Sequence, residues 1–192
     1  MKVKVNALSK VYPGFVDCIK TDVKIADPYT GKEIKTLAIW DTGATNSVIT
    51  KSKAIELGLK PLGKAVVMGV HGAKEVSVYV AKITLNNENI SLITQVSECD
   101  ELSSAGDTGM LIGMNVIGKG DFSISSYGGS TVMTFRAPSI KRTDFVEELK
   151  EYNHCLKMHE NNLLHHRPDK CACGSGKLFK NCHDKYIPDE AK

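Results

Sequence analysis

The sequence lacks the long apolar segment that a membrane span requires, and it has no strong excess of charge of either sign. No apolar run approaches the roughly 18 residues of a transmembrane helix. The first residues, MKVKVNALSK, carry charges where a signal peptide needs its apolar stretch. The net charge is only +3, and no basic stripe interleaved with aromatic residues indicates nucleic-acid binding. Internal repeats and low-complexity segments are also missing. These absences predict a soluble, cytoplasmic protein.

What is present suits a globular fold with a small appendage. The 192 residues are 42% hydrophobic and 24% charged, which is enough apolar material for a packed core in one domain. The cysteines are unevenly spread. Three are isolated, whereas the other three lie close together near the C-terminus: Cys171, Cys173 and Cys182. In a reducing compartment such a cluster indicates metal ligands rather than disulfides.

Short strand-like runs, separated by turn residues, fill the region from Cys18 to Arg136. The alternating run VDCIKTDVKIA, the turn DPYTGKE and the run IKTLAIW predict a hairpin. A second hairpin is expected where SYGG separates DFSIS from STVMTFRA. The segment from Lys51 to Leu57 predicts a short helix that Gly58 ends at its C-cap. Many short strands with one or two small helices indicate a mainly β protein, either a barrel or a sandwich.

The character of the chain changes after Pro138. From Thr143 to His165, apolar or bulky residues recur at steps of three and four, which is the spacing of one face of a helix. Asp144, with Glu147 three residues later, is typical of a capped helix start. The expected divisions are a domain at residues 1–138, a helical linker at 139–168 and a cysteine-containing module at 169–187.

One carboxylate stands at the end of an apolar, strand-like run. In AIWDTGATNSVIT, Asp41 follows Ile39 and Trp40, and Gly43 permits a sharp turn of the backbone just after it. Charges are rarely buried unless they are paired or used, so Asp41 either caps a turn or takes part in chemistry. A second Asp-Thr-Gly begins at Asp107. It follows the polar ELSSAG rather than an apolar strand, and we interpret Asp107 as a loop residue.

The stretch AIWDTGATNSVIT, the glycine-flanked GVHG and the later LIGMNVIGKGDFSIS together resemble the retropepsin-like aspartic proteases in residue types, spacing and order. The resemblance covers residues 15–138 and implies a closed β-barrel, with one lobe per chain. It implies a catalytic loop of three residues: Asp41, Thr42 and Gly43. The apolar pair before Gly113 would pack beneath this loop. The flap that closes over a polypeptide substrate would have four residues at its tip: Gly69, Val70, His71 and Gly72.

A chain with one such aspartate supplies half of an aspartic peptidase site, because the chemistry needs two carboxylates around one water. The resemblance therefore implies a homodimer in which Asp41 of each chain meets its twin on a two-fold axis. Two carboxylates about 3 Å apart repel by about 5 kcal/mol at an effective dielectric constant of about 20, so the pair would hold one proton. The ionised member would activate the water, and the protonated member would protonate the developing oxyanion. No cofactor is expected for catalysis.

The sequence departs from the retroviral members of this family near the expected dimer interface. Those members carry an arginine right after the glycine of the apolar-apolar-Gly element and an acid two residues after the Asp-Thr-Gly glycine, and the two form a salt bridge. Here the positions hold Met114 and Thr45, so both partners are absent together and no unpaired buried charge results. We expect the dimer to be held in another way, by the termini or by the helix.

The C-terminal run CACGSGKLFKNCH predicts a structural zinc site with four ligands: Cys171, Cys173, Cys182 and His183. Three thiols and one imidazole make a closed tetrahedral set, and the segment has too little apolar material to fold without a metal. The alternative is a disordered tail with reduced thiols. The run resembles the SEC-C motif, which implies a docking surface for a chaperone, a translocation component or a ribosome-associated protein.

Two functions remain open from the sequence. The first is a homodimeric aspartic endopeptidase with a zinc-stabilised docking module. The second is a non-catalytic, retropepsin-like scaffold whose tail recruits a protein partner or the ribosome. An intact Asp-Thr-Gly at the end of an apolar strand favours the enzyme, because a scaffold does not need an acid delivered to that place.

Overall fold

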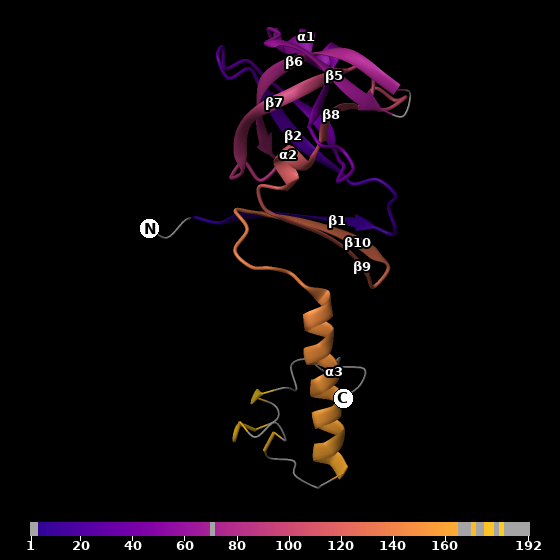
Figure 1. The fold of residues 1–192 in the computed structure, drawn as a ribbon, viewed down its shortest axis with the longest axis vertical. Coiled ribbons are helices and arrows are strands. Elements are labelled where there is room, and N and C mark those ends of the chain that lie inside the picture. Colours follow the sequence, from indigo (N-terminus) through magenta and orange to yellow (C-terminus); the bar gives the residue numbers. More distant parts are fainter. Residues whose placement is uncertain (1–3, 70–71, 165–169, 172–174, 179–180, 183–192) are drawn as a thin grey trace. The chain divides into compact units, whose positions relative to one another are not determined.

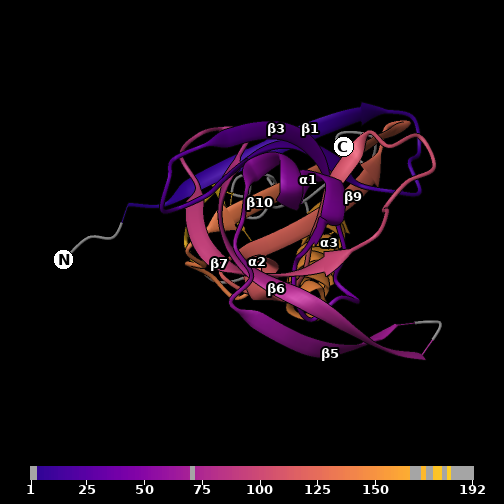
Figure 2. The same cartoon turned by 90° about the horizontal axis from the view of Figure 1, so that it is seen from above.

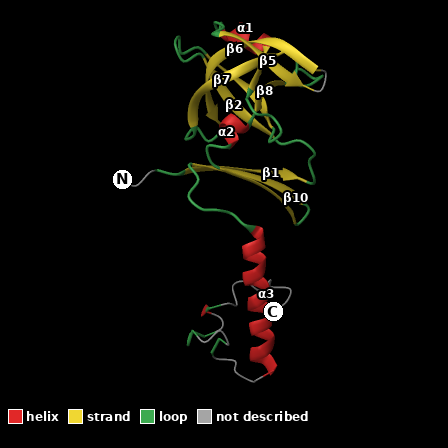
Figure 3. Ribbon diagram, viewed as in Figure 1, coloured by secondary structure: helices red, strands yellow, loops and turns green. Residues whose placement is uncertain are grey.

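The computed structural model describes residues 4–69, 72–164, 170–171, 175–178 and 181–182. The chain forms two compact units, residues 1–140 and residues 141–192, and each is described by itself. Strands dominate the first unit and one long helix dominates the second (Figure 3). The expectation of a mainly β protein followed by a helix is therefore confirmed.

The elements of the first unit (Figure 1) run in this order: β1 (Asn6–Pro13), β2 (Lys20–Ala26), β3 (Glu33–Trp40), β4 (Val48–Thr50), α1 (Lys51–Leu57), β5 (Gly63–Gly69), β6 (Gly72–Leu85), β7 (Ser91–Cys99), β8 (Thr108–Ile112), α2 (Met114–Ile117), β9 (Asp121–Tyr127) and β10 (Ser130–Ala137). The second unit holds α3 (Phe145–Leu164).

Six of the strands close into a barrel in the order β2-β3-β8-β4-β7-β6, because β6 also pairs with β2. The pairs β3–β8 and β4–β7 are parallel, whereas the other pairs in the ring are antiparallel. Figure 2 looks into the barrel and shows the β5–β6 hairpin extending away from it. The sequence patterns left two architectures open, a barrel and a sandwich. The structure is a barrel, as the family resemblance implied.

The barrel interior is filled by apolar side chains that occupy every second position of its strands. Ile25, Ala38, Ile83 and Met110 are all completely buried there. Each comes from a different strand, and each strand turns every second side chain inward. This alternation is what the sequence showed for the first hairpin, whose turn is closed by Asp27 through its backbone and carboxylate.

Helix α1 confirms the expected short helix to the residue. It spans Lys51–Leu57, and Gly58 caps its C-terminus at φ 74°, a left-handed conformation that glycine adopts without strain. The Gly58 N–H donates to Ile55 O at 2.9 Å. The buried side chains of Ala54 and Leu57 join the barrel core.

Strand β5 pairs with β6 outside the ring, and three further strands form a separate sheet in the order β1-β10-β9, which lies beneath the barrel in Figure 1. Trp40, the last residue of β3, joins the two layers. Its ring stacks on Phe122 of β9 with a centroid distance of 5.2 Å and an interplanar angle of 9°. Phe135 of β10 lies against the same ring, also at 5.2 Å. The sheet is thus packed directly under the end of β3, just before Asp41.

The sequence did not predict β1. Its inward positions include Lys10, whose charge hides the alternation of Leu8 and Tyr12. In the structure the aliphatic part of the Lys10 side chain lies along the sheet. Its Nζ donates to Lys20 O at 3.1 Å and lies 5.3 Å from the centre of the Tyr12 ring. The position of β1 is therefore set by its pairing with β10, a strand far along the chain, and not by a local sequence pattern.

The second unit consists of α3 and the described parts of the cysteine-containing segment. The helix starts as expected, because the Asp144 carboxylate accepts hydrogen bonds from the N–H groups of Val146 (3.1 Å) and Glu147 (3.4 Å). Leu156 and Cys182 pack against the buried Cys171 in a small cluster. Within the residues described, no helix combines the length and apolar character needed to cross a membrane.

Candidate active site

Asp41 lies at the point where β3 leaves the barrel. The last residue of β3, Trp40, is in register with Ile112 of the neighbouring parallel strand β8. The Asp41 N–H donates to Ile112 O at 3.0 Å, which fixes the backbone of the aspartate. Its carboxylate is partly exposed, and Oδ1 accepts a hydrogen bond from the Gly43 N–H at 2.8 Å. The side chain is therefore oriented by the turn that follows it, and it stays accessible.

Backbone hydrogen bonds from the junction between β8 and α2 hold the loop that follows Asp41. The N–H of Met114 donates to Ala44 O at 2.8 Å, and the N–H of Asn115 donates to Thr45 O at 3.0 Å. A Cβ on Gly113 would stand 2.6 Å from Asn46 C and O and 2.8 Å from Ala44 O. Glycine at position 113 is thus required for this close approach of two backbone segments. The apolar-apolar-Gly element lies where the family resemblance placed it.

Ser47 and Asn115 form a buried polar network that the sequence analysis missed. The Gly113 N–H donates to Ser47 Oγ at 3.0 Å, and Ser47 donates to Asn115 Oδ1 through both its hydroxyl and its N–H, each at 2.8 Å. Asn115 Nδ2 in turn donates to Gln95 O and Thr94 Oγ1, both at 3.2 Å. The network ties the loop to β7. A small polar residue followed far along the chain by an asparagine gives no local signal, so sequence reasoning could not pair them.

The other two residues of the expected catalytic loop are exposed. Thr42 and Gly43 form the turn itself, and a Cβ on Gly43 would lie 3.2 Å from Asp41 Oδ1. Any side chain at position 43 would therefore crowd the carboxylate. Thr45 is also exposed and Met114 is 42% exposed, so the positions of the missing retroviral ion pair lie on the surface of the single chain.

The expected flap corresponds to the β5–β6 hairpin. Gly69 pairs with Gly72 at its end, while Val70 and His71 lie outside the described residues. Among the described strands, residues 72–77 of β6 pair with β5 alone, so this part of the hairpin is a two-stranded arm. Lys74 Nζ reaches Asp100 Oδ2 at 2.5 Å, which links the arm to the end of β7.

The arm carries exposed apolar side chains on one of its faces. Val66 is 69% exposed and Met68 is 80% exposed. Both lie two residues apart on β5 and therefore point to the same side of the arm. An arm of this kind can supply apolar contacts to an extended chain.

Asp107 is held by its own loop, as the sequence analysis expected. Its Oδ1 accepts hydrogen bonds from Ser103 Oγ at 2.6 Å and Thr108 Oγ1 at 2.9 Å, and Lys20 Nζ lies 3.7 Å away. These hydrogen bonds, with a smaller contribution from Lys20, lower the pKa of Asp107. A Cβ on the following Gly109 would meet Thr36 Oγ1 at 2.6 Å. The second Asp-Thr-Gly thus has a structural explanation.

Two of the four expected zinc ligands lie within the described residues. Cys171 is 4% exposed and shares a cluster with Cys182 and Leu156, so two thiols far apart in the segment are brought together. The Cys171 N–H donates to Lys177 O at 2.8 Å. Cys173 and His183 lie outside the described residues. Within the described residues, no three possible ligands are grouped in a way that could hold a metal ion.

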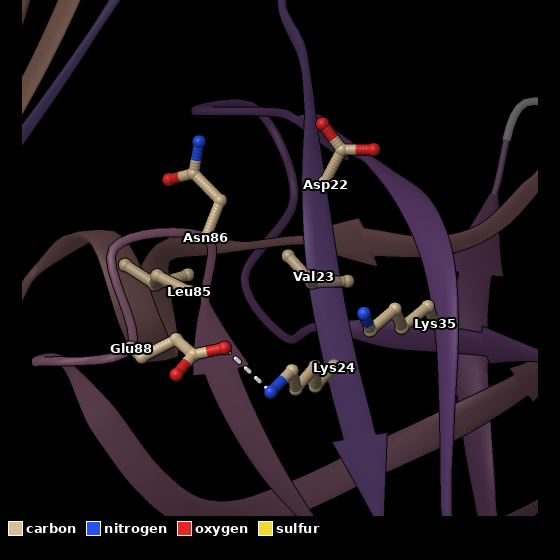
Figure 4. A pocket seen from close by; sticks show the side chains of 7 residues that line it. All are labelled: Asp22, Val23, Lys24, Lys35, Leu85, Asn86 and Glu88. Carbon is tan, nitrogen blue, oxygen red and sulfur yellow. Dashed lines mark hydrogen bonds and ion pairs between the residues drawn. The ribbon is translucent and has the colours of Figure 1, made fainter.

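A separate surface pocket lies on the β2–β3 hairpin and does not include Asp41. Figure 4 shows its lining residues: Asp22, Val23, Lys24, Lys35, Leu85, Asn86 and Glu88. Lys24 faces Lys35 across the hairpin, and Glu88 pairs with Lys24 at 2.6 Å. That ion pair lowers the pKa of Glu88 and raises the pKa of Lys24. The two acidic and two basic side chains of the lining balance in charge. No sequence pattern indicated this pocket.

A protein-family model described as aspartyl protease matches residues 22–116. The match runs from β2 to α2, includes both Asp41 and Gly113, and agrees with the resemblance to aspartic proteases over this region. It does not reach the cysteine-containing segment, and the SEC-C resemblance stays a prediction. No curated protein matches the chain.

Solved structures similar to the chain include a retropepsin-like protease and retroviral or retroviral-like proteases. A retropepsin-like aspartic protease from Rickettsia conorii is 13% identical, with 71% of this chain and 98% of that chain covered and a TM-score of 0.42. The simian foamy virus protease is 18% identical, with coverage of 52% and 92% and a TM-score of 0.36. The retroviral protease-like domain of Ddi1 from Leishmania major is 19% identical, with coverage of 57% and 82% and a TM-score of 0.40.

Proposed function

We propose that this protein is an aspartic endopeptidase that works as a homodimer, in which each chain contributes Asp41. The observation that carries the proposal is the set of groups that contact the Asp41 carboxylate, which differs from the set at two other aspartates. Asp107 and Asp121 are both engaged by hydroxyl groups and by a basic side chain. The Asp41 carboxylate, in contrast, accepts a hydrogen bond from the Gly43 N–H, and no cationic side chain in the described part of the chain forms an ion pair with it. An acid that is held in place but not neutralised is available for chemistry.

The proposed mechanism uses one proton shared by two Asp41 side chains. The ionised carboxylate takes a proton from a water molecule as the water oxygen attacks the scissile carbonyl carbon. The protonated carboxyl gives its proton to the carbonyl oxygen, which becomes the hydroxyl of a tetrahedral intermediate. Collapse of that intermediate breaks the C–N bond, and the amine leaves with a proton from the pair. The Gly43 N–H keeps Oδ1 oriented throughout.

The β5–β6 arm is proposed to close over the bound polypeptide. Closure would exclude bulk water, which strengthens every electrostatic interaction around the two carboxylates. The residues proposed to touch the substrate are those at the arm tip: Gly69, Val70, His71 and Gly72. Val66 and Met68 would add apolar contacts along the same arm.

For the C-terminal segment we propose a structural zinc ion held by Cys171, Cys173, Cys182 and His183. The packing of Cys182 against Cys171 supports this donor set, because the two thiols belong to different halves of the proposed set of ligands. Thiolate and imidazole ligands form closed tetrahedral sites of this type. The module would serve as a docking surface for a protein partner in a reducing, cytoplasmic environment.

Replacement of the proposed catalytic acid provides the test. In the Asp41→Asn variant, cleavage of a peptide library is expected to fall by at least about 10³-fold, while the circular dichroism spectrum and the oligomeric state stay as in the wild type. The matched control is Asp107→Asn, which changes an aspartate of the same tripeptide and is expected to keep its activity. Activity that survives Asp41→Asn but not Asp107→Asn would reverse the assignment.

The same experiment separates the enzyme from the scaffold. If the wild-type chain and Asp41→Asn bind the same partner and neither cleaves any peptide of the library, the chain is a retropepsin-like scaffold. That outcome would leave the fold and the proposed zinc site untouched.

A further inference from the structure

The first half of helix α3 carries an apolar face that the rest of the described chain leaves open. Phe145, Val146 and Leu149 are 72%, 64% and 56% exposed. Leu156, two turns later on the same face, is half-buried and packs against Cys171. Large apolar side chains that stay open together on one face of a helix indicate a surface that another element covers.

The residues of this face follow the spacing of a coiled coil. Phe145, Leu149, Tyr152 and Leu156 are separated by steps of four, three and four residues, which place them at alternating d and a positions of a heptad repeat. These four residues form what we call the α3 seam. The opposite face of the helix is charged, and the exposed side chains of Glu147 and Lys150 form an ion pair there at 2.8 Å.

The distribution of exposure along the α3 seam favours a second copy of the same helix as its occupant, in parallel orientation. In a parallel pair, the open residues Phe145 and Leu149 of one copy meet the same residues of the other copy. An antiparallel pair that overlaps over the same length would instead set Phe145 opposite Leu156, which Cys171 already contacts. Only the parallel orientation therefore covers open surface with open surface along the whole seam.

The polar residues beside the seam are also compatible with a parallel pair. In this orientation a residue at a g position lies next to the e position of the following heptad in the other helix. Glu148 of one copy would thus face the exposed Asn153 of the other. Glu148 also has Lys141 of its own chain at 3.9 Å. In the described part of the seam, like charges therefore do not oppose one another.

We propose that α3 pairs in parallel with α3 of a second copy, as a short two-stranded coiled coil along the α3 seam. A two-fold axis parallel to the helices relates the two copies. Residues 138–144 join β10 to α3 and span at most about 25 Å, so the coiled coil raises the effective concentration of each Asp41 half-site around the other. This inference rests on the proposed function, since the half-site is what requires a second copy.

The α3 seam is too short to hold a dimer by itself. An isolated helix of about 12–15 residues is marginal in water, and stable interfaces bury about 1,200 Å² or more. The coiled coil therefore adds to the contacts that the two half-sites make. Its loss is expected to weaken the dimer, which a measurement of the dissociation constant detects.

A charge placed in the α3 seam provides the first test. Leu149→Lys would bring two ammonium groups together at the axis, and the dissociation constant of the dimer, measured by sedimentation velocity, is expected to rise by at least about tenfold. The matched control is Ile55→Lys on helix α1, where the apolar side chain is 70% exposed, and its dissociation constant is expected to equal that of the wild type.

A second variant separates the loss of apolar contact from any change at position 149. Leu149→Met keeps an apolar side chain of similar size and is expected to dimerise as the wild type does. Circular dichroism verifies that all three variants keep their helix content. A dissociation constant of Leu149→Lys equal to that of the wild type would overturn the proposal and assign the open face to another occupant, such as a different protein.

A cross-linking experiment tests the orientation of the two helices. Under oxidising conditions, Leu149→Cys is expected to form disulfide-linked dimers beyond the background of the wild-type chain, because position 149 meets its own copy. Lys150→Cys, on the charged face, is expected to stay at the background. A mixture of Leu149→Cys and Tyr152→Cys chains that cross-links, while neither variant cross-links alone, would indicate antiparallel helices and overturn the parallel pair.

These outcomes are separate from the fate of the proposed function. A chain that cleaves peptides while Leu149→Lys dimerises as the wild type does loses the coiled coil and keeps the peptidase. A chain that dimerises through α3 but cleaves nothing keeps the coiled coil and loses the peptidase. A wild-type chain that stays monomeric at all concentrations overturns the coiled coil, and the peptide library then decides the function.

Discussion

At the scale of single residues, the role of an aspartate in this protein follows from what surrounds its carboxylate. Asp121 receives hydrogen bonds from Ser139 and Arg136, which lower its pKa, with the Ser139 hydroxyl first. Asp107 is engaged in a similar way by its own loop. Asp41 shares the Asp-Thr-Gly sequence with Asp107, yet its environment is a partly exposed turn at the end of a buried strand. The tripeptide alone therefore does not define the site, and the preceding strand does.

The Ser47–Asn115 network gives a prediction for stability. Ser47 is completely buried, and its hydroxyl both accepts from Gly113 and donates to Asn115. Ser47→Ala leaves the Gly113 N–H without this acceptor and removes one of the two hydrogen bonds to Asn115 Oδ1, which is expected to lower the free energy of unfolding by about 1–3 kcal/mol. Urea denaturation measures the loss. Thr45→Ala, two residues earlier and exposed, is the control and should unfold as the wild type does. Equal stability of all three chains would show that the network contributes nothing.

Gly113 gives a prediction for activity. A methyl group at this position would meet the backbone of Asn46 at 2.6 Å, and backbone atoms cannot move aside as a flexible side chain can. Gly113→Ala is therefore expected to displace the loop that carries Asp41 and to lower the cleavage rate by about 100-fold. Gly63→Ala serves as the control, because a methyl group there has no atom within 4 Å. A Gly113→Ala enzyme with the wild-type rate would show that the loop position is not critical.

At the scale of elements, local signals predicted some elements well and missed others. The helix α1 and the turns of two hairpins were predicted from short sequence patterns, because glycine caps and turn residues act on their immediate neighbours. Strand β1 was missed, since a lysine occupies one of its inward positions. Its place in the sheet is decided by β10, more than 100 residues later in the chain.

The β2–β3 turn gives a prediction for pH dependence. The N–H of Tyr29 and the hydroxyl of Thr30 both donate to the Asp27 carboxylate, and the first of these is the main cause of its lowered pKa. A pKa that is lower in the folded state means that Asp27 stabilises the fold at neutral pH, and that this contribution is lost as the pH falls through the folded pKa.

We therefore expect Asp27→Asn to have a lower urea midpoint than the wild type at about pH 7 and a nearly equal one at about pH 2, below the ordinary range of aspartate. The control is Asp22→Asn, an exposed aspartate whose carboxylate lies 3.9 Å from Lys10 Nζ. It should differ little from the wild type at either pH, as exposed ion pairs usually do. A gap between Asp27→Asn and the wild type that stays constant from neutral to acid pH would contradict this account.

At the scale of the whole molecule, the chain combines a barrel that has a large apolar core with a second unit whose described residues show little apolar contact. The barrel core holds completely buried residues from many strands, whereas the described cluster of the second unit contains Leu156, Cys171 and Cys182. The proposed zinc ion would add the free energy of metal binding to the stability of this small cluster.

The zinc proposal predicts that metal removal affects one unit alone. The full-length protein is expected to carry about one zinc ion per chain. A chelator should increase amide hydrogen exchange in α3 and the described residues after it, and leave the exchange of β2, β3 and β8 unchanged. Cys171→Ser should lose the metal, whereas Cys18→Ser, outside the cluster, should retain it. Full zinc content in Cys171→Ser would exclude Cys171 as a ligand.

The sequence by itself determined the features that depend on neighbours along the chain: the alternation of the barrel strands, the end of α1 at Gly58, and the difference between an aspartate after an apolar strand and one in a polar loop. Only the tertiary structure decided that Ser47 meets Asn115, that β1 pairs with β10, and that Leu149 of α3 is left exposed while Leu156 packs against Cys171. The physical reason is that hydrogen bonds and side-chain packing between distant segments are specified by geometry, and geometry arises only when the whole core has formed.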